Sequence, residues 1–149
     1  MTEVEFHTGV ADRLGFACRL LRKAVRQGAR VLVTAPPEAL TELDRLLWTF
    51  EERDFLPHVR VPGAAAGLRA RTPIWLAADA EAALAGAAEA PRVVVNLGAA
   101  APPDLQALDR LIEVLSTDVD DVAQGRTRWR AYKAAGLTVV HHAGADGRA

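Results

Sequence analysis

Short runs of β-branched and aliphatic residues alternate along this chain with longer segments in which the apolar residues follow helical spacing. The clearest run is residues 92–97, Arg-Val-Val-Val-Asn-Leu, whose continuous apolar character is typical of a strand buried on both faces. Further strands are expected at residues 4–7, 30–34, 58–61, 73–77 and 137–141. Because strands that alternate with helices generally join into a parallel sheet, the pattern predicts an α/β fold.

The segments between the expected strands have the apolar spacing or the boundary residues of helices. They are residues 11–27, 36–50, 81–90, 103–115 and 118–136. In the fourth, five apolar residues are expected to face inward: Leu105, Leu108, Leu111, Ile112 and Leu115. Residues 63–67, Gly-Ala-Ala-Ala-Gly, indicate a flexible surface connection. The elements together predict a Rossmann-like three-layer sandwich, with a mostly parallel sheet and helices on both faces.

A chain of 149 residues is long enough for one domain with a substantial core. We expect that domain to span residues 1–142, followed by a flexible C-terminal tail at residues 143–149. No signal peptide and no apolar run near the roughly 20 residues that span a bilayer are visible, which predicts a cytoplasmic protein without membrane contact. The single cysteine, Cys18, falls in an apolar helical stripe and is expected to be buried and unreactive.

Enzyme chemistry has little support in the sequence. The net charge of −1 argues against general polyanion binding, so any contact with nucleic acid must come from a local patch. A nucleotide site is disfavoured because no glycine-rich phosphate loop follows the early strands, where Pro36 and Pro37 instead remove amide donors. We therefore expect no catalytic residue and no cofactor.

A metal site is equally disfavoured. Asp118, Asp120 and Asp121 cluster where a helix should begin, and acidic residues favour helix N-termini without any metal. His141 and His142 are adjacent, so in a strand they would point to opposite faces of the sheet and could not easily share one ion.

Residues 126–136 carry the strongest indication of a binding surface. In a helix, four of them would share one face at i, i+3, i+4 and i+7: Arg126, Trp129, Arg130 and Lys133. Unpaired cations are costly to bury, so this face suits a small anionic and partly apolar partner. A solvated basic helix whose aromatic residues dip into the core explains the same spacing, and both interpretations remain open.

A second candidate surface lies around Trp48 and Phe55. The preceding helix already has a core-facing stripe in Leu40, Leu43 and Leu47, so the two aromatic residues are free to form an exposed apolar patch. The alternative is that both simply cover an edge of the sheet.

Along nearly its whole length the chain resembles the chi subunit family of the bacterial DNA polymerase III clamp-loader assembly. The resemblance rests on an N-terminal strand and basic helix followed by several short motifs. These are residues 28–33 (Gly-Ala-Arg-Val-Leu-Val), 46–48 (Leu-Leu-Trp), 54–58 (Asp-Phe-Leu-Pro-His), 95–98 (Val-Asn-Leu-Gly) and 126–136. The most specific part is the order of the Trp, Phe-x-Pro-His and Arg-x-Arg-aromatic-x-x-Tyr-x-x-x-Gly motifs.

The resemblance implies a non-catalytic adaptor with a Rossmann-like fold. Members of the family pair with the psi subunit, which tethers them to the clamp loader, and the same surface can accept an accessory helicase. They also bind the C-terminal tail of single-stranded DNA-binding protein (SSB), which is acidic and ends in phenylalanine. Contact with DNA is then only indirect. The alternative is a module that binds single-stranded nucleic acid directly through the basic aromatic helix.

The resemblance also assigns residues to each partner. Tail binding is assigned to Arg126, Trp129, Arg130, Lys133 and Val119, and psi binding to Trp48, Phe55, Pro57 and His58. Tyr132 matches a family aromatic residue that either lines the tail pocket or anchors the helix to the sheet. Val122 stands where the family pattern can carry a further lysine, which predicts weaker electrostatic attraction or its transfer to Arg128 and Arg130.

Overall fold

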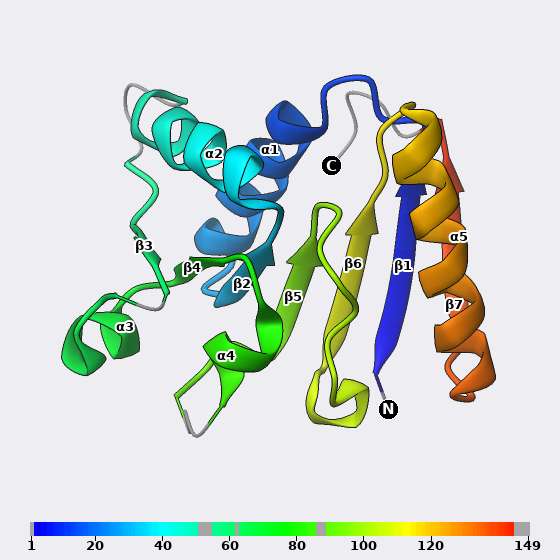
Figure 1. The fold of residues 1–149 in the computed structure, drawn as a ribbon. Helices are drawn as coiled ribbons and strands as arrows, with labels where there is room; N and C mark the ends of the chain where they lie inside the picture. Colours follow the sequence, from blue (N-terminus) through cyan, green and yellow to red (C-terminus); the bar gives the residue numbers. More distant parts are fainter. Residues whose placement is uncertain (1, 51–54, 62, 86–88, 145–149) are drawn as a thin grey trace.

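A parallel seven-stranded sheet forms the centre of the computed structural model, which describes residues 2–50, 55–61, 63–85 and 89–144. The strand order is β3-β4-β2-β5-β6-β1-β7, so β3 and β7 are the two edges (Figure 1). The strands are β1 (Glu3–Thr8), β2 (Val31–Thr34), β3 (His58–Arg60), β4 (Ile74–Ala77), β5 (Val93–Asn96), β6 (Arg110–Val114) and β7 (Val139–Ala143). All the pairings are parallel, which confirms the predicted α/β class.

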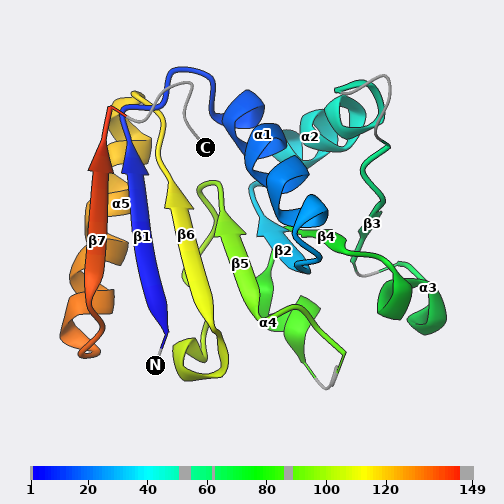
Figure 2. The same cartoon turned by 180° about the vertical axis from the view of Figure 1, so that it is seen from behind.

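Helices lie on both faces of the sheet, as the alternation predicts. The helices are α1 (Arg13–Arg26), α2 (Pro37–Thr49), α3 (Ala66–Arg71), α4 (Ala80–Leu84) and α5 (Val119–Ala134), with a short 3₁₀ turn, η1, at Leu105–Ala107. Of these, α1 and α2 pack on one face, and α4 and α5 on the other (Figures 1 and 2). The chain leaves α1 through Gly28, whose φ of +77° is readily adopted by glycine.

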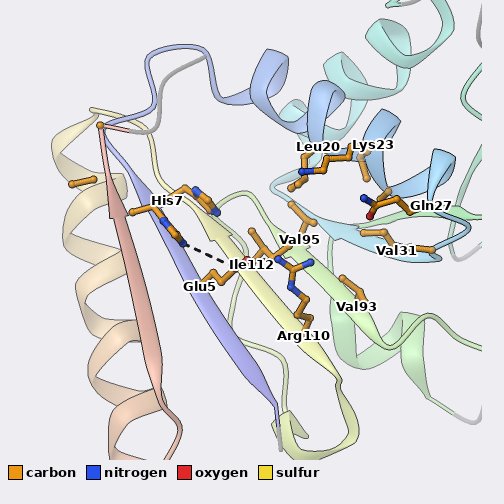
Figure 3. A pocket seen from close by; sticks show the side chains of 16 residues that line it. Glu5, His7, Leu20, Lys23, Gln27, Val31, Val93, Val95, Arg110 and Ile112 are labelled. Carbon is orange, nitrogen blue, oxygen red and sulfur yellow. Dashed lines mark hydrogen bonds and ion pairs between the residues drawn. The ribbon is translucent and has the colours of Figure 1, made fainter. Parts of the chain in front are cut away.

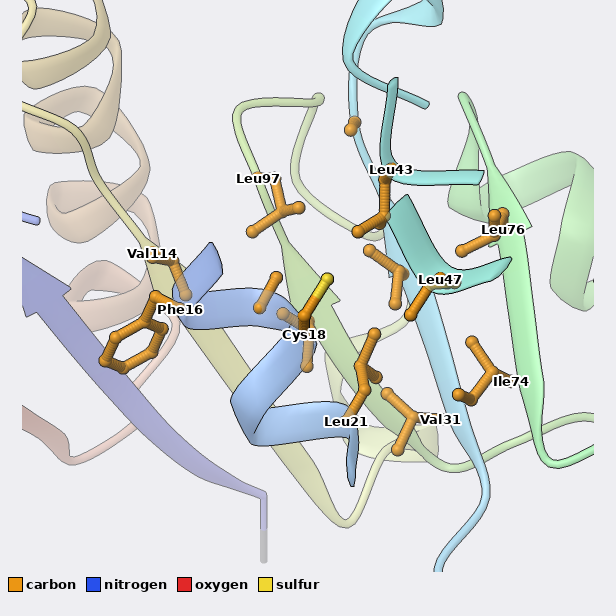
Figure 4. Close-up of a cluster of buried hydrophobic side chains, with 14 of the residues drawn as sticks. Phe16, Cys18, Leu21, Val31, Leu43, Leu47, Ile74, Leu76, Leu97 and Val114 are labelled. Atoms are coloured by element: carbon orange, nitrogen blue, oxygen red, sulfur yellow. The ribbon is translucent and has the colours of Figure 1, made fainter. Parts of the chain in front are cut away.

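Each face of the sheet has its own apolar core. On the α1 and α2 face, Phe16, Leu21, Leu43 and other apolar residues pack onto the strands (Figure 4). Cys18 belongs to this cluster and is 1% exposed, so the predicted buried thiol is confirmed. The opposite core surrounds Trp75, which is completely buried.

The region of residues 103–115 differs from the prediction. A single helix is wrong: residues 105–107 form η1 and residues 110–114 form β6, which pairs with β5 on one side and β1 on the other. The spacing of the five apolar residues fits either structure. A central strand is buried on both faces, so its apolar run lacks the alternation that would distinguish it from a buried helix.

Other boundaries differ by smaller amounts. The helix predicted at residues 81–90 is the short α4, and residues 86–88 lie outside the described part of the chain. Residues 63–67 were expected to form a flexible connection, but residues 66 and 67 belong to α3, which begins at Ala66. Strand β7 extends through Ala143, and residues 145–149 of the proposed tail lie outside the described residues. Among the described helices, none has the length and apolar character needed to cross a membrane.

Candidate functional site

Helix α5 begins at an acidic cap. The Asp118 carboxylate accepts hydrogen bonds from the backbone N–H groups of Asp120 and Asp121 at 2.9 and 3.1 Å. Asp120 and Asp121 occupy the first turn, where their charge is favoured by the helix dipole. The described residues contain no group of three or more His, Cys, Asp or Glu side chains arranged to hold a metal ion. The acidic cluster therefore has a structural explanation in starting α5.

The inner face of α5 is joined to the sheet by polar contacts. The buried Glu113 carboxylate of β6 accepts hydrogen bonds from Arg128 Nε at 3.1 Å and from the Tyr132 hydroxyl at 2.6 Å. Arg128 Nη2 also lies 3.1 Å from Glu113 Oε1, without the alignment of a hydrogen bond. Burial raises the pKa of Glu113, while Arg128 and the hydrogen bonds act in the opposite direction.

These contacts settle two expectations. Tyr132 is completely buried and anchors α5 to the sheet, as one of the two interpretations of this residue predicted. Arg128 is only 8% exposed and paired with Glu113, so the expected transfer of partner-binding charge to Arg128 is wrong. Helical spacing places Arg128 two residues from Arg126, which turns it toward the sheet. The sequence offered no sign that a buried carboxylate would meet it there.

A pocket of about 460 Å³ lies beside Trp129, on the side of α5 that faces β1 and β7. The Trp129 ring packs edge-on against Phe6 of β1, with ring centroids 4.9 Å apart, and against His141 of β7 at 5.6 Å. The pocket is lined by Phe6, Thr8, Leu115, Val122, Gly125, Arg126, Trp129, Arg130 and His141. The pocket thus combines apolar side chains with two arginines, and the Trp129 side chain is only half-buried.

The residues predicted for tail binding are partly gathered at this pocket. Arg126, Trp129 and Arg130 line it, and the Lys133 ammonium lies 5.7 Å from the centroid of the Trp129 ring. Val119 is 81% exposed at the start of α5 and is not among the lining residues; Val122, one turn later, is. The pocket with cations at its border is compatible with partner binding, and Trp129 also packs against the core while the three cations are exposed, so both interpretations of this face remain open.

Several pocket residues were not anticipated from the sequence. Thr8 and His141 join the pocket from β1 and β7, and the Thr8 hydroxyl lies 2.7 Å from His141 Nε2. Phe6 and Thr8 alternate along β1 and therefore share one face, which is a signal present in the sequence. The pairing of Phe6 with His141 across β1 and β7 was not predictable, because it depends on strand order and register.

The second predicted surface is exposed. Trp48 at the end of α2 is 62% exposed and Phe55 is 54% exposed, and their ring centroids lie 5.0 Å apart. The stripe of Leu40, Leu43 and Leu47 is buried beneath them. The predicted exposed apolar rings are thus present. Both rings also contact His58 of the edge strand β3, with centroids 5.3 and 6.3 Å away, so the alternative that they cover the sheet edge remains open.

His58 supports this patch from below. Its side chain is 2% exposed, and Nε2 lies 2.7 Å from an Asp44 carboxylate oxygen of α2. Its Nδ1 lies 2.8 Å from the carbonyl oxygen of Leu56, and its ring centroid is 5.3 Å from that of Trp48. Pro57 is half-buried beside it. These contacts fix the end of α2 against the segment before β3, so His58 acts in shaping the patch.

A second pocket lies on the opposite face of the sheet, between α1 and strands that include β5, β6, β1 and β7 (Figure 3). It has a volume of about 510 Å³ and contains Glu5, His7, Arg110 and His142 among its lining residues. The Arg110 guanidinium already pairs with Glu5 at 2.7 Å, and the rings of His7 and His142 stack with centroids 4.7 Å apart. His141 and His142 thus face opposite sides of the sheet, as predicted.

The two exposed surfaces lie at opposite edges of the sheet. Trp48 and Phe55 pack near His58 of β3, whereas Trp129 packs against β1 and β7. Strands β3 and β7 are the opposite edges of the sheet (Figure 1). Seven strands at about 4.8 Å spacing span roughly 30 Å, so one partner at each surface could bind without contacting the other.

Comparison with known proteins identifies the family of this chain. The sequence matches the family described as DNA polymerase III chi subunit, HolC, over residues 1–140. It is also similar to DNA polymerase III subunit chi of Pseudomonas aeruginosa, with 30% identity over 152 aligned positions that cover 95% of this chain and 96% of the relative. Because the match extends over almost the whole chain, from β1 into β7, this protein belongs to the DNA polymerase III chi subunit family.

Proposed function

We propose that this accessory subunit of DNA polymerase III links the clamp loader, through psi, to the C-terminal tail of SSB during replication. The observation that carries the proposal is the pocket beside Trp129, in which apolar surface and two arginines are presented together. The subunit itself has no catalytic role in this proposal and uses no cofactor. It acts by holding two partners at once, in the cytoplasm where replication takes place.

The chemistry of the pocket is complementary to an acidic peptide that ends in phenylalanine. Phe6, Leu115 and Trp129 provide apolar surface for the terminal ring. Arg126 presents a guanidinium at the same pocket, and its planar fork suits the terminal carboxylate. Arg130 and Lys133 add positive charge for the acidic residues that precede the phenylalanine.

The Trp48 and Phe55 patch is the proposed psi surface. Two neighbouring aromatic rings, both more than half exposed, form the kind of apolar anchor that dominates protein interfaces. His58 and Pro57 contribute by holding this segment in place, since the His58 side chain is almost completely covered. An accessory helicase that used the same rings would compete with psi, because both partners would need the same apolar area.

Simultaneous binding gives the adaptor its effect. Individual SSB tails are expected to bind weakly, and several contacts to SSB assembled on one strand would act together. The tail contact should weaken as salt is added, because the cations at the pocket are exposed and their attraction is screened.

The first test is fluorescence anisotropy with a labelled SSB C-terminal peptide at two salt concentrations. Wild-type protein should bind with salt-sensitive affinity, and Arg126→Ala should reduce binding by at least about tenfold, as expected for loss of a charge-assisted contact. Arg92→Ala is the matched control, because Arg92 is also exposed but lies next to Asp109, away from the pocket. A peptide without the terminal phenylalanine tests the apolar part.

The psi surface requires a separate test. Phe55→Ala should weaken co-purification with psi and leave the peptide affinity unchanged, while Arg126→Ala should do the reverse. If each substitution impairs both contacts equally in folded protein, the assignment of two separate surfaces is wrong. If the peptide does not bind but single-stranded DNA does, and Arg126→Ala abolishes that binding, the direct nucleic-acid alternative replaces this proposal.

A further inference from the structure

Helix α5 is attached to the sheet in an unusual way. Its buried residues are Gly125, Arg128 and Tyr132, and none of the three has an aliphatic side chain. In most surface helices an apolar stripe against the core determines how the helix is rotated about its axis. In α5 the apolar contacts with the sheet are confined to the aromatic rings of Tyr132 and Trp129, which pack against Phe6, so a polar contact can help to determine which residues face the sheet and which face the pocket.

Glu113 provides that contact. Arg128 and Tyr132 are one turn apart on α5, and both donate hydrogen bonds to the Glu113 carboxylate. The distances are 3.1 Å from Arg128 Nε and 2.6 Å from the Tyr132 hydroxyl. Two donors that converge on one buried acceptor fix both the rotation of the helix and its position along its axis. Trp129 follows Arg128 directly, about 100° further around the helix, which directs its ring toward Phe6 and His141.

The carboxylate is itself held from the opposite side. Asn96 of β5 donates from Nδ2 to Glu113 Oε2 at 3.0 Å and from the same nitrogen to the Ala99 carbonyl oxygen at 2.9 Å. The Asn96 side-chain oxygen accepts from Thr34 Oγ1 of β2 at 3.0 Å and from the Ala99 N–H at 2.8 Å. A network that extends over three strands leaves Glu113 little freedom, so its position is a fixed reference for α5.

We propose that Glu113 is the positioning residue of the pocket: it sets the rotation of α5 and thereby places Trp129 and Arg126 where they line the pocket. Glu113 does not contact the partner in this proposal and acts only through Arg128 and Tyr132. The consequence for tail binding rests on the proposed function, whereas the placement of Trp129 can be measured without any partner.

The experiment uses the full-length protein labelled with 5-fluorotryptophan and ¹⁹F NMR. The chain has three tryptophans in different surroundings: Trp129 at the pocket, Trp75 in the core and Trp48 on the exposed patch. Glu113→Gln keeps the shape of the side chain but removes its charge. The expected result is a shifted or broadened Trp129 resonance with unchanged Trp75 and Trp48 resonances, and peptide affinity reduced by about tenfold.

Two further variants separate positioning from stability. Glu113→Gln combined with Arg128→Met removes the unpaired buried cation and should recover stability, but Trp129 should remain displaced because the pair is still absent. Ile74→Val, in the other core, is the control for mild destabilisation and should leave Trp129 unchanged. If Glu113→Gln fails to fold, Tyr132→Phe takes its place, because it removes only the hydrogen bond from the Tyr132 hydroxyl to Glu113. The same shift or broadening of the Trp129 resonance is then expected.

The outcomes distinguish the two proposals. An unchanged Trp129 resonance in Glu113→Gln, or full recovery of Trp129 and peptide binding in the double variant, overturns the positioning role of Glu113. A displaced Trp129 in a protein whose wild type binds no peptide would leave the positioning role intact and reject the proposed function.

Discussion

Arg13 of α1 and Asp121 of α5 form an ion pair that joins helices from opposite faces of the sheet, with Nη1 and Oδ2 2.8 Å apart. Arg13 follows β1 and Asp121 follows β6, so the ion pair lies at the carboxyl ends of these two parallel strands. Both side chains are largely buried, at 20% and 11% exposure. Asp121 also accepts hydrogen bonds from the Ser116 N–H and hydroxyl at 2.7 and 2.9 Å, which ties the ion pair to the segment before α5.

Asp121→Asn should therefore destabilise the protein. The substitution weakens the ion pair and the hydrogen bonds that converge on Oδ2, at an expected cost of about 1–3 kcal/mol in the free energy of unfolding. For a chain of this length each kcal/mol lowers Tm by about 2–4 °C. Thermal unfolding followed by circular dichroism measures the change. Asp120→Asn, at an exposed position in the same turn, is the control, and an equal effect of both substitutions would assign the loss to the helix dipole instead.

Gly125→Ala should affect the pocket more than the fold. A Cβ at this position would come within 2.4 Å of Leu115 Cδ1, and Leu115 is both buried and a pocket-lining residue. Overpacking costs about 1–3 kcal/mol, but alanine recovers about 1 kcal/mol of helix propensity. The displaced Leu115 side chain should obstruct the pocket, so peptide affinity should fall, and the net cost of at most about 2 kcal/mol should lower Tm by no more than about 8 °C. Gly67→Ala, with open space around its Cβ, is the matched control. Undiminished peptide affinity in Gly125→Ala would mean that the apolar part of the ligand lies elsewhere.

His7 should make stability depend on pH. Burial, followed by the nearby His142 and Arg110, lowers its pKa below the ordinary value of 6.5, and Glu5 opposes this shift. A lowered pKa means that the folded protein binds the proton less tightly than the unfolded chain. The contribution of neutral His7 is therefore complete above pH 6.5 and is lost as the pH falls through the lowered pKa. Urea unfolding at pH 7.5 and 5.5 should show a smaller pH dependence in His7→Gln than in the wild type. Equal dependence in the two proteins would assign the effect to other groups.

Cys18 should be inert in the folded protein. Burial raises the pKa of its thiol to about 11, and the side chain is 1% exposed in the core beneath α1. Because the thiolate is the reactive form, labelling by a disulfide reagent at pH 7.5 should occur only as fast as the protein opens. The rate should rise with urea in parallel with unfolding. Fast labelling without denaturant would show that α1 opens locally, which the packing of Phe16 and Leu21 argues against.

The strands and helices with a clear period were predictable from the sequence. Residues 92–97 have continuous apolar character, and the segment that became α1 has a regular stripe ended by glycine, so local chemistry alone indicates their structure. Residues 103–115 were not predictable in this way. Their apolar spacing is compatible with a helix, and only the neighbouring strands β5 and β1, contributed by distant parts of the chain, select the extended form.

In the candidate site, too, some residues could be predicted from the sequence and others could not. Residues on one helix face, such as Arg126 and Trp129, could be grouped from spacing alone, and the exposure of Trp48 followed from a stripe already complete without it. The partnership of Arg128 with Glu113 could not be foreseen, because it depends on the helix lying over a particular strand. The same holds for Thr8 and His141, which the order of the strands brings to the pocket.

The strand order also determines how the molecule would bear mechanical load. If psi binds near β3 and the SSB tail near β7, as proposed, tension would run across the strands, along the hydrogen bonds of the sheet. The two edge strands are paired over different lengths: β3 is paired with β4 at three positions, whereas β7 is paired with β1 at five. Leu40, Leu43 and Leu47 of α2 are buried in the core. Force applied at Trp48 would therefore pass through α2 into the central strands, and would not load the short pairing between β3 and β4. A tether attached to a core helix in this way resists peeling better than one attached to an edge strand.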